Sequence, residues 1–431
     1  MDFADVIITF IYSLTIILLS IVYVKINKNN PNIKRYFLIA IVLRIFGGIS
    51  FALVYFYYYA GGDTLNYYKD SLIINTLLSD DFFNWLKIYF IDAGAYDNDL
   101  YYYTIRMNFY MDDASFFIDK LASIINLFTF KSFIGTTIIF AMIGFMGSWQ
   151  LFLTINKILP SSTSQVAIAC LFLPSIVFWG SGIMKDTICF MALATFFSNI
   201  MVALFEKNLK PKVLISIAVS GYVLYILKIY ILVCFLPPLF LYVYFILKDY
   251  IRSKTLKKII GPILFAFAIS LGIYAAYLIT LENVRYSFQN ITHTAQITAD
   301  YIGSVSQISG GSFYSIGKLD FSFATVVQLL PKAIIVTLYR PFLWEVKSPI
   351  MLFSALEGVF IFYLTLQYIF SLLFKKGTSN PFVPFAILFS IVFAFAVGVT
   401  SNNFGTLARY KIPMLPFLVC AISSASKKNK I

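Results

Sequence analysis

Charged residues are scarce in this chain of 431 residues, since Asp, Glu, Lys and Arg make up 12% of it and hydrophobic residues 60%. A water-soluble domain of this length needs a far more polar surface, so the composition excludes that class. Apolar runs recur at about 20 residues, the length that a helix needs to cross roughly 30 Å of hydrocarbon. The sequence therefore predicts an all-α, polytopic helical bundle that forms one integral membrane domain over residues 1–431.

Several features of other protein classes are also missing. The four cysteines lie in or beside apolar runs without metal-type spacing, so we interpret them as small hydrophobic residues. No internal repeat, separate soluble domain or nucleotide-binding glycine loop is present. The net charge of +13 falls largely on short loops and does not indicate nucleic acid as a partner. No cofactor is predicted, and a divalent metal is left open.

We expect about eleven transmembrane helices. They cover residues 6–24, 36–60, 133–153, 166–184, 187–205, 213–227, 229–247, 259–281, 350–374, 382–399 and 412–424. Clusters of Lys and Arg follow alternate spans, and such clusters mark cytoplasmic loops. This pattern predicts a multi-pass protein of the cytoplasmic membrane with its N-terminus outside and its C-terminus inside.

Two long outer segments, residues 61–131 and 282–349, separate groups of spans. The first mixes aromatic residues with carboxylates between Asp80 and Asp119, which favours amphipathic helices at the level of the lipid headgroups. In the second, the polar stretch Ile291–Ser315 suggests a mobile flap. Phe321–Trp344 is apolar and suggests an interfacial or re-entrant helix.

The stretch Cys170–Phe190 is the most informative part of the sequence. Two apolar runs meet there at the adjacent pair Lys185 and Asp186, with only the small residues Gly180, Ser181 and Gly182 before it. Charges held at a corner between two spans indicate a polar site at the membrane surface. A simple ion pair at a helix end is an equally good interpretation.

Further charges interrupt apolar sequence on the predicted outer side. The basic residues among them, with Lys185, are Lys228, Arg340, Arg409 and Lys411. Together they predict a semi-buried cationic pocket for a phosphate-bearing ligand whose tail stays in the bilayer. Any one of them could instead be a snorkelling residue. Arg44 and Glu357 lie inside spans, where each is expected to pair with another polar group of the bundle.

Asp63 follows Gly61 and Gly62 where the second span ends, and Tyr67 and Tyr68 come soon after it. The tyrosine rings offer flat apolar faces for a sugar, and the carboxylate could act as general base toward a sugar hydroxyl. The alternative is an N-cap aspartate after a glycine turn.

Four stretches resemble the Wzy-type and EpsG-like polysaccharide polymerases and related multi-spanning C-type glycosyltransferases. They are GGDTLNYY, PSIVFWGSGIMKD, LKIYILVCFLPPL and TLARYKIPMLPFL, about a fifth of the chain. The chain departs from such families in lacking a paired acidic motif in its first outer loop.

The resemblance implies a membrane glycosyltransferase or polymerase that uses polyprenyl-diphosphate-linked saccharide at the outer face, in cell-envelope or exopolysaccharide synthesis. Asp63 would be the catalytic acid-base group. The diphosphate would be surrounded by Lys185, Asp186, Lys228, Arg340, Arg409 and Lys411. Glu345, Tyr67 and Tyr68 would support these residues without contacting the diphosphate. Other polysaccharide-assembly proteins would be partners, besides the bilayer. A transporter or flippase of lipid-linked saccharide and a non-catalytic subunit of an assembly complex remain alternatives.

The predicted topology is testable by cysteine labelling in intact cells. A cysteine introduced at Asp97 should react with a membrane-impermeant maleimide, whereas one at Lys254 should react only after permeabilisation. Labelling of position 254 from outside would show that the predicted orientation is wrong.

Overall fold

The structure is a computed structural model, which describes residues 3–207, 209–248, 312–317, 323–374 and 380–424 together with short pieces between 259 and 270. Within these residues it is all-helical apart from an isolated β-bridge between Phe313 and Asn403. The chain divides into two compact units, described here separately. Unit 1 is Met1–Thr154 with Cys170–Lys228, and unit 2 is Ile155–Ala169 with Ile229–Ile431.

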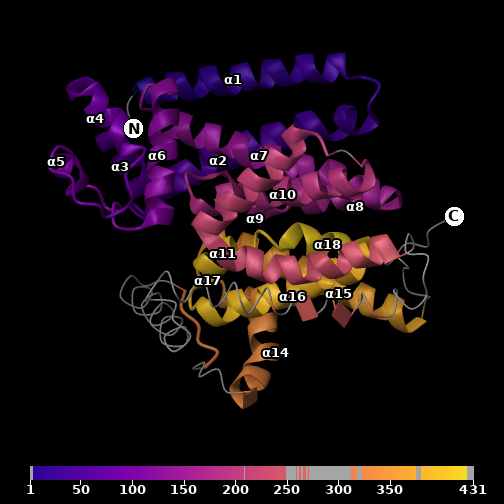
Figure 1. The fold of residues 1–431 in the computed structure, drawn as a ribbon. Coiled ribbons are helices and arrows are strands. Elements are labelled where there is room, and N and C mark those ends of the chain that lie inside the picture. Colours follow the sequence, from indigo (N-terminus) through magenta and orange to yellow (C-terminus); the bar gives the residue numbers. More distant parts are fainter. Residues whose placement is uncertain are drawn as a thin grey trace. The chain divides into compact units, whose positions relative to one another are not determined.

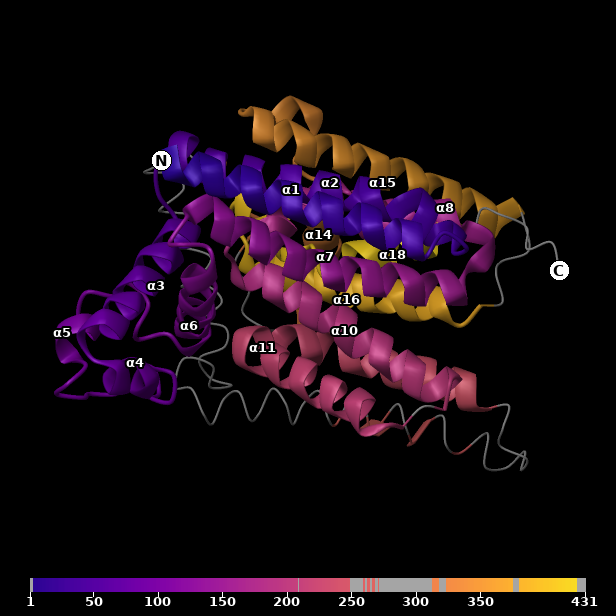
Figure 2. The same ribbon diagram turned by 90° about the horizontal axis from the view of Figure 1, so that it is seen from above.

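Long apolar helices form the body of unit 1 and lie side by side (Figures 1 and 2). They are α1 (Phe3–Ile26), the continuous run of η1 (Ile33–Phe37), α2 (Leu38–Leu53) and η2 (Val54–Tyr58), then α7 (Phe133–Ile158) and α10 (Lys185–Phe205). Each is long and apolar enough to cross a bilayer. Only 6% of the most apolar stretch of α1 is buried in the protein, so most of its surface is left to face lipid.

The first long segment between spans is a group of shorter helices at one end of this bundle (Figure 2). They are α3 (Asp63–Asp80), α4 (Phe82–Ile88), α5 (Tyr101–Thr104) and α6 (Asp113–Phe128). Gly62 precedes α3 with φ of 99°, a left-handed conformation that glycine adopts without strain. Asp81 caps α4 by accepting hydrogen bonds from the backbone of Phe83 and Asn84, and Asp112 caps α6 in the same way.

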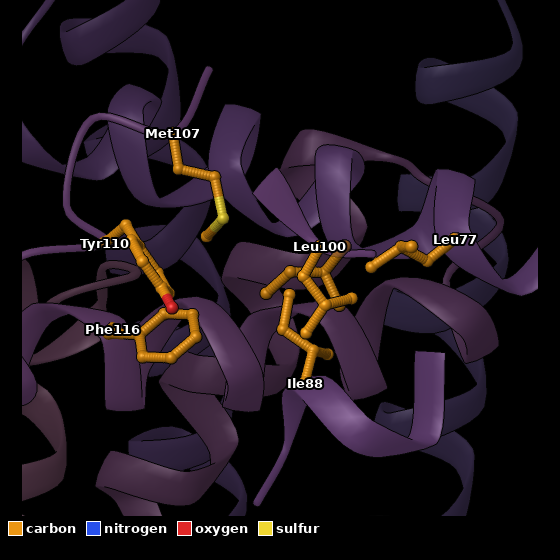
Figure 3. Packing of buried hydrophobic residues seen from close by; sticks show 7 residues of the cluster. Leu77, Ile88, Leu100, Met107, Tyr110 and Phe116 are labelled. Atoms are coloured by element: carbon orange, nitrogen blue, oxygen red, sulfur yellow. The ribbon is translucent and has the colours of Figure 1, made fainter. Parts of the chain in front are cut away.

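These four helices share a small apolar core. Figure 3 shows Leu77 of α3, Ile88 of α4 and Leu100 converging, with Met107 and Phe116 in the same cluster. Ile88 and Leu100 are fully buried, whereas Phe83 and Phe90 are about four-fifths exposed at 80% and 81%. The segment is therefore a folded helical cap with aromatic side chains left on its surface. Its expected place at the headgroup level stays a prediction.

The span expected at residues 166–184 is broken. The helical runs Pro160–Phe172 and Pro174–Ser181 meet at an angle of 43°. Leu173 is extended because the ring of Pro174 disfavours helical geometry in the residue before it, and Pro174 then starts α9 (Pro174–Phe178) at a position where no backbone donor is lost. The break brings α9 against α2 and directs the chain into the start of α10.

Unit 2 is a second helical bundle. Its elements include α8 (Thr163–Ala167), the second half of α11 (Pro211–Leu247), α14 (Phe323–Tyr339), α15 (Pro349–Phe374), α16 (Phe382–Thr400), α17 (Phe404–Tyr410) and α18 (Leu415–Ser424). Its core is aromatic: the ring centroid of Phe389 lies 4.9 Å from that of Phe235 and 5.4 Å from that of Phe417. Thr337 of α14 also donates a hydrogen bond to the carbonyl of Ala394 in α16 at 2.8 Å.

The boundary at Lys228 between the spans predicted over 213–227 and 229–247 is confirmed, because α11 loses helical geometry there, with φ of −153° and ψ of 75°. The expected count of about eleven spans is not confirmed. The described residues contain seven helices able to cross a membrane, or up to eight if the bent pair counts as one span. The difference arises because α11 joins two predicted spans, α18 is only 10 residues long and residues 259–281 lie almost entirely outside the described residues.

Two other expectations concern the second long segment. The proposed flap Ile291–Ser315 lies outside the described residues except for its last four. Most of the apolar stretch Phe321–Trp344 forms the helix α14, and the apolar part of that helix is Val327–Tyr339.

Gly47 gives a test of the packing in unit 1. A Cβ there would lie 2.1 Å from the carbonyl oxygen of Val177 in α9, so Gly47→Ala should force α2 and α9 apart and destabilise the protein by about 1–3 kcal/mol. Gly61→Ala is the matched control, because a Cβ there meets only the carbonyl oxygen of Tyr59 at 3.9 Å. Unfolding in detergent micelles measures both. Equal stability of the two variants would contradict this packing.

Candidate functional site

Lys185 is the first residue of α10, and it links that span to the helical cap. Its Nζ lies 3.2 Å from Oδ2 of Asp112 and donates a hydrogen bond to Oγ of Ser115 at 3.0 Å. Asp112 is the N-cap of α6, so its carboxylate accepts a hydrogen bond from the backbone of that helix and also pairs with the ammonium group of Lys185. The side chains of Lys185 and Asp112 are 26% and 51% exposed. An ammonium group that a ligand could reach therefore lies beside a fixed carboxylate and a hydroxyl.

Asp186 and its neighbour Lys185 form ion pairs with different residues. Its Oδ1 lies 2.5 Å from Nζ of Lys228, at the break in α11, and the two side chains are only 4% and 10% exposed. Asp186 also sits in the first turn of α10, where a negative charge is favourable. The sequence hypothesis of an ion pair at this corner is thus correct in part, because the pair is formed with Lys228.

The residues predicted around a sugar belong to α3. Tyr67 is buried, with its hydroxyl 3.5 Å from Oγ of Ser115 and its ring centroid 4.8 Å from that of Phe109. Tyr68 points elsewhere and donates its hydroxyl proton to the carbonyl of Lys131. Asp63 is half-buried at the start of α3, one turn before Tyr67 and on the same helix face. Gly62 takes the N-cap position, so Asp63 is the first helical residue and the N-cap alternative is wrong.

Asp119 of α6 was not predicted. It is completely buried, and neither carboxylate oxygen has a hydrogen-bond partner among the described residues. Burial raises the pKa of Asp119 well above its usual value, and the nearby Asp70 raises it further, while Lys185 opposes the shift. Asp70 is also buried, but it accepts three hydrogen bonds from Asn108 and the backbone of Phe109.

The sequence of α6 does indicate that polar residues lie on its buried side. Along α6, Ser115, Asp119, Ser123 and Asn126 recur at helical spacing and lie on the buried side. Asn126 donates to Oγ of Ser71 at 2.6 Å, and Asn75 donates to the carbonyl of Ser123 at 3.0 Å. The contact between α3 and α6 is therefore hydrogen-bonded along its length, with Asp119 inside it.

In unit 2, Arg340 follows α14 and forms an ion pair with Glu345. Its Nε lies 3.1 and 3.0 Å from the two carboxylate oxygens, and its Nη2 contacts one of them. The guanidinium carbon lies 5.0 Å from the ring centroid of Phe404 and 5.5 Å from that of Tyr314. Burial would raise the pKa of Glu345, but Arg340 and the Phe342 backbone lower it overall. Glu345 thus touches Arg340 directly.

Lys411 and Glu357 form a second pair in unit 2. Nζ of Lys411 lies 3.6 Å from Oε1 of Glu357, and their side chains are 1% and 0% exposed. The expected pairing of Glu357 within the bundle is confirmed, as is that of Arg44, which donates to the carbonyl of Ile176 and to Oγ of Ser148. Arg409 lies in the last turn of α17, half-buried, with its guanidinium carbon 5.8 Å from the ring centroid of Tyr410.

Ion pairs with carboxylates limit which residues of the predicted cationic pocket can bind a phosphate group. Four of these basic residues pair with a carboxylate as follows: Lys185 with Asp112, Lys228 with Asp186, Arg340 with Glu345 and Lys411 with Glu357. Lys228 and Lys411 are enclosed, whereas Lys185 and Arg340 are partly exposed and can meet a ligand directly. Lys185 and Lys228 belong to unit 1 and the other three to unit 2, so their assembly into one pocket stays a prediction.

The described residues contain no group of three or more His, Cys, Asp or Glu side chains placed to share a metal ion. Comparison with family models, curated proteins and solved structures gives no match. The fold and composition show a multi-pass integral membrane protein.

The burial of the Lys228–Asp186 pair leads to a stability test. Lys228→Met should lower the free energy of unfolding by about 3–5 kcal/mol, because it removes the ammonium group that compensates a buried carboxylate. Lys185→Met should cost about 0–1 kcal/mol, since its pair is partly exposed and screened by water. In the double variant Lys228→Met with Asp186→Asn, stability should largely return. Equal losses for the two lysine variants would contradict the assigned pairs.

Proposed function

We propose that the protein is a membrane glycosyltransferase or polymerase that acts on polyprenyl-diphosphate-linked saccharide at the outer face of the cytoplasmic membrane. The observation that carries the proposal is the position of Lys185. Its partly exposed ammonium group lies at the end of a span, against a helical cap that contains aromatic and carboxylate side chains. A lipid-linked saccharide needs the same combination, because its diphosphate lies at the membrane surface while its sugars extend into water.

In this proposal the partly exposed cation of each unit is a phosphate-binding group, and the enclosed ion pairs hold the helices that present it. Lys185 contributes a flexible ammonium group. Arg340 contributes a planar guanidinium that can bind two phosphate oxygens at once. Asp112 and Glu345 orient these cations before substrate binds, and they share them with the phosphate afterwards. Asp63 accepts the proton of the attacking sugar hydroxyl.

A transporter of lipid-linked saccharide is the second candidate, and one observation favours it. Lys411 and Glu357 form a fully buried ion pair in a membrane bundle, and ionisable groups inside membrane proteins often mark transport pathways. The two functions differ in product: a transferase makes a new glycosidic bond, whereas a transporter moves an unchanged lipid.

Asp63→Asn tests the proposed base. The variant should still bind lipid-linked saccharide, but it should lose about 10²–10⁴-fold in turnover because an amide cannot accept the proton. Asp113→Asn is the matched control, since Asp113 is the exposed first residue of α6 just as Asp63 is the first residue of α3. Turnover and binding are measured in liposomes. Normal turnover by Asp63→Asn would remove the only proposed base.

Arg340→Lys tests the proposed phosphate contact. The substitution keeps the charge but loses the guanidinium that can hold two oxygens together, so binding of the lipid-linked donor should weaken strongly. Arg340→Ala should abolish it. Because Arg340 also pairs with Glu345, Arg340→Met combined with Glu345→Gln serves as a control for folding. Donor binding by Arg340→Lys equal to that of the wild type would exclude a specific role for the guanidinium.

A further inference from the structure

Asp119 lies beside the site of Lys185 without taking part in its visible hydrogen bonds. Ser115 and Asp119 are four residues apart on α6 and so occupy the same helix face. Ser115 accepts from Lys185 at 3.0 Å and donates to Asp112 at 2.5 Å, whereas the Asp119 carboxyl has no hydrogen-bond partner in the described part of the chain. A completely buried carboxyl is thus placed one helical turn behind a partly exposed ammonium.

Asp119 faces charged and titratable groups on three helices. Asp70 comes from α3, Asp112 from the start of α6 and Lys185 from α10. Tyr67 of α3 contacts Ser115, one helical turn before Asp119. Lys120 is next to Asp119 in sequence but points away, with its ammonium donating to the carbonyls of Tyr89 and Ile91. Among the residues that the structure describes, Lys185 is the cation whose charge acts on Asp119, and Lys185 also pairs with Asp112.

The charge balance around Lys185 depends on the proton of Asp119. When Asp119 is neutral, the ammonium of Lys185 and the carboxylate of Asp112 balance, and an anion that shares the ammonium with Asp112 is repelled by that one carboxylate and not by Asp119. When Asp119 is ionised, a second carboxylate lies behind the ammonium in a poorly solvated place, where charges interact more strongly than in water.

We propose that a phosphate group binds at Lys185 only while Asp119 carries a proton, so that lipid-diphosphate binding and proton binding support each other. The inference rests on the proposed function, because it takes the diphosphate of a lipid-linked saccharide as the ligand. By linkage, a proton that favours the anion must itself be held more tightly once the anion is bound.

The sign of the pH dependence follows from the carboxyl pair. Burial raises the pKa of Asp119 well above its usual value, and the proximity of Asp70 adds to this. Burial raises the pKa of Asp70 as well, but its three N–H donors lower it in part. Asp119 is therefore the carboxyl of this pair that keeps its proton to higher pH. Anion affinity should be full at lower pH and fall as pH rises through the pKa of Asp119.

Infrared spectroscopy of the protein in nanodiscs tests the proton directly. A carbonyl stretching band of a protonated carboxyl should persist at a pH where exposed carboxyls are ionised, disappear as the pH rises through the pKa of Asp119 and be missing in Asp119→Asn. Asp113→Asn, which changes an exposed carboxylate of the same helix, should keep the band. If wild type and Asp119→Asn have the same spectrum at every pH where exposed carboxyls are ionised, Asp119 is ionised as well and the inference is wrong.

Binding of geranylgeranyl diphosphate, measured between pH 6 and 10 in the same nanodiscs, tests the coupling. Above the pKa of Asp119 the affinity of the wild type should fall by up to about tenfold per pH unit, because one proton is involved. Asp119→Asn, which stays neutral, should bind with a shallower pH dependence that reflects the titration of the ligand alone. The same slope in both proteins would overturn the coupling but leave the proposed function standing. Absence of binding by the wild type at every pH would overturn both.

Discussion

Charge compensation within the membrane helices and at their ends is the constraint on which this structure depends. An ionised group removed from water is costly unless an opposite charge or several hydrogen bonds replace the water. Lys228 with Asp186 and Lys411 with Glu357 meet this requirement by pairing, and Arg44 meets it by donating to Ser148 and a backbone carbonyl. Each pair joins segments that are distant in sequence, so the pairs also fix which helices lie together within each unit.

Lys185 and Asp119 are less completely compensated than these groups, and for that reason they are the most informative residues of unit 1. Lys185 places a positive charge at the N-terminal end of α10, where the helix dipole does not favour it. Its partner Asp112 is already engaged as the cap of α6. Asp119 is buried with no hydrogen-bond partner among the described residues. Groups held in such places at a cost to stability are candidates for function.

The sequence predicted the helical class, the limits of several spans, the break at Lys228 and the unusual corner at Lys185 and Asp186. Hydrophobic length and local turn residues determine these features, so they can be recognised in one stretch of sequence. The pairing of the charges could not be predicted in this way. Asp112 precedes Lys185 by 73 residues, and Asp186 precedes Lys228 by 42, so only the folded chain brings them together. Asp119 could have been found from the helical spacing of Ser115, Asp119, Ser123 and Asn126, which marks a polar face of α6, but the partner that this face packs against is given only by the fold.

The central claim is that the protein joins saccharides carried on a polyprenyl diphosphate, and the lipid-linked glycans of a cell that lacks it provide the most direct test. If the claim is correct, deletion of the gene should cause short polyprenyl-diphosphate-linked saccharides to accumulate in the outer leaflet, where the missing transfer would use them. Accumulation of the same lipids in the inner leaflet would contradict the claim and indicate a transporter. An unchanged set of lipid-linked glycans would contradict both functions.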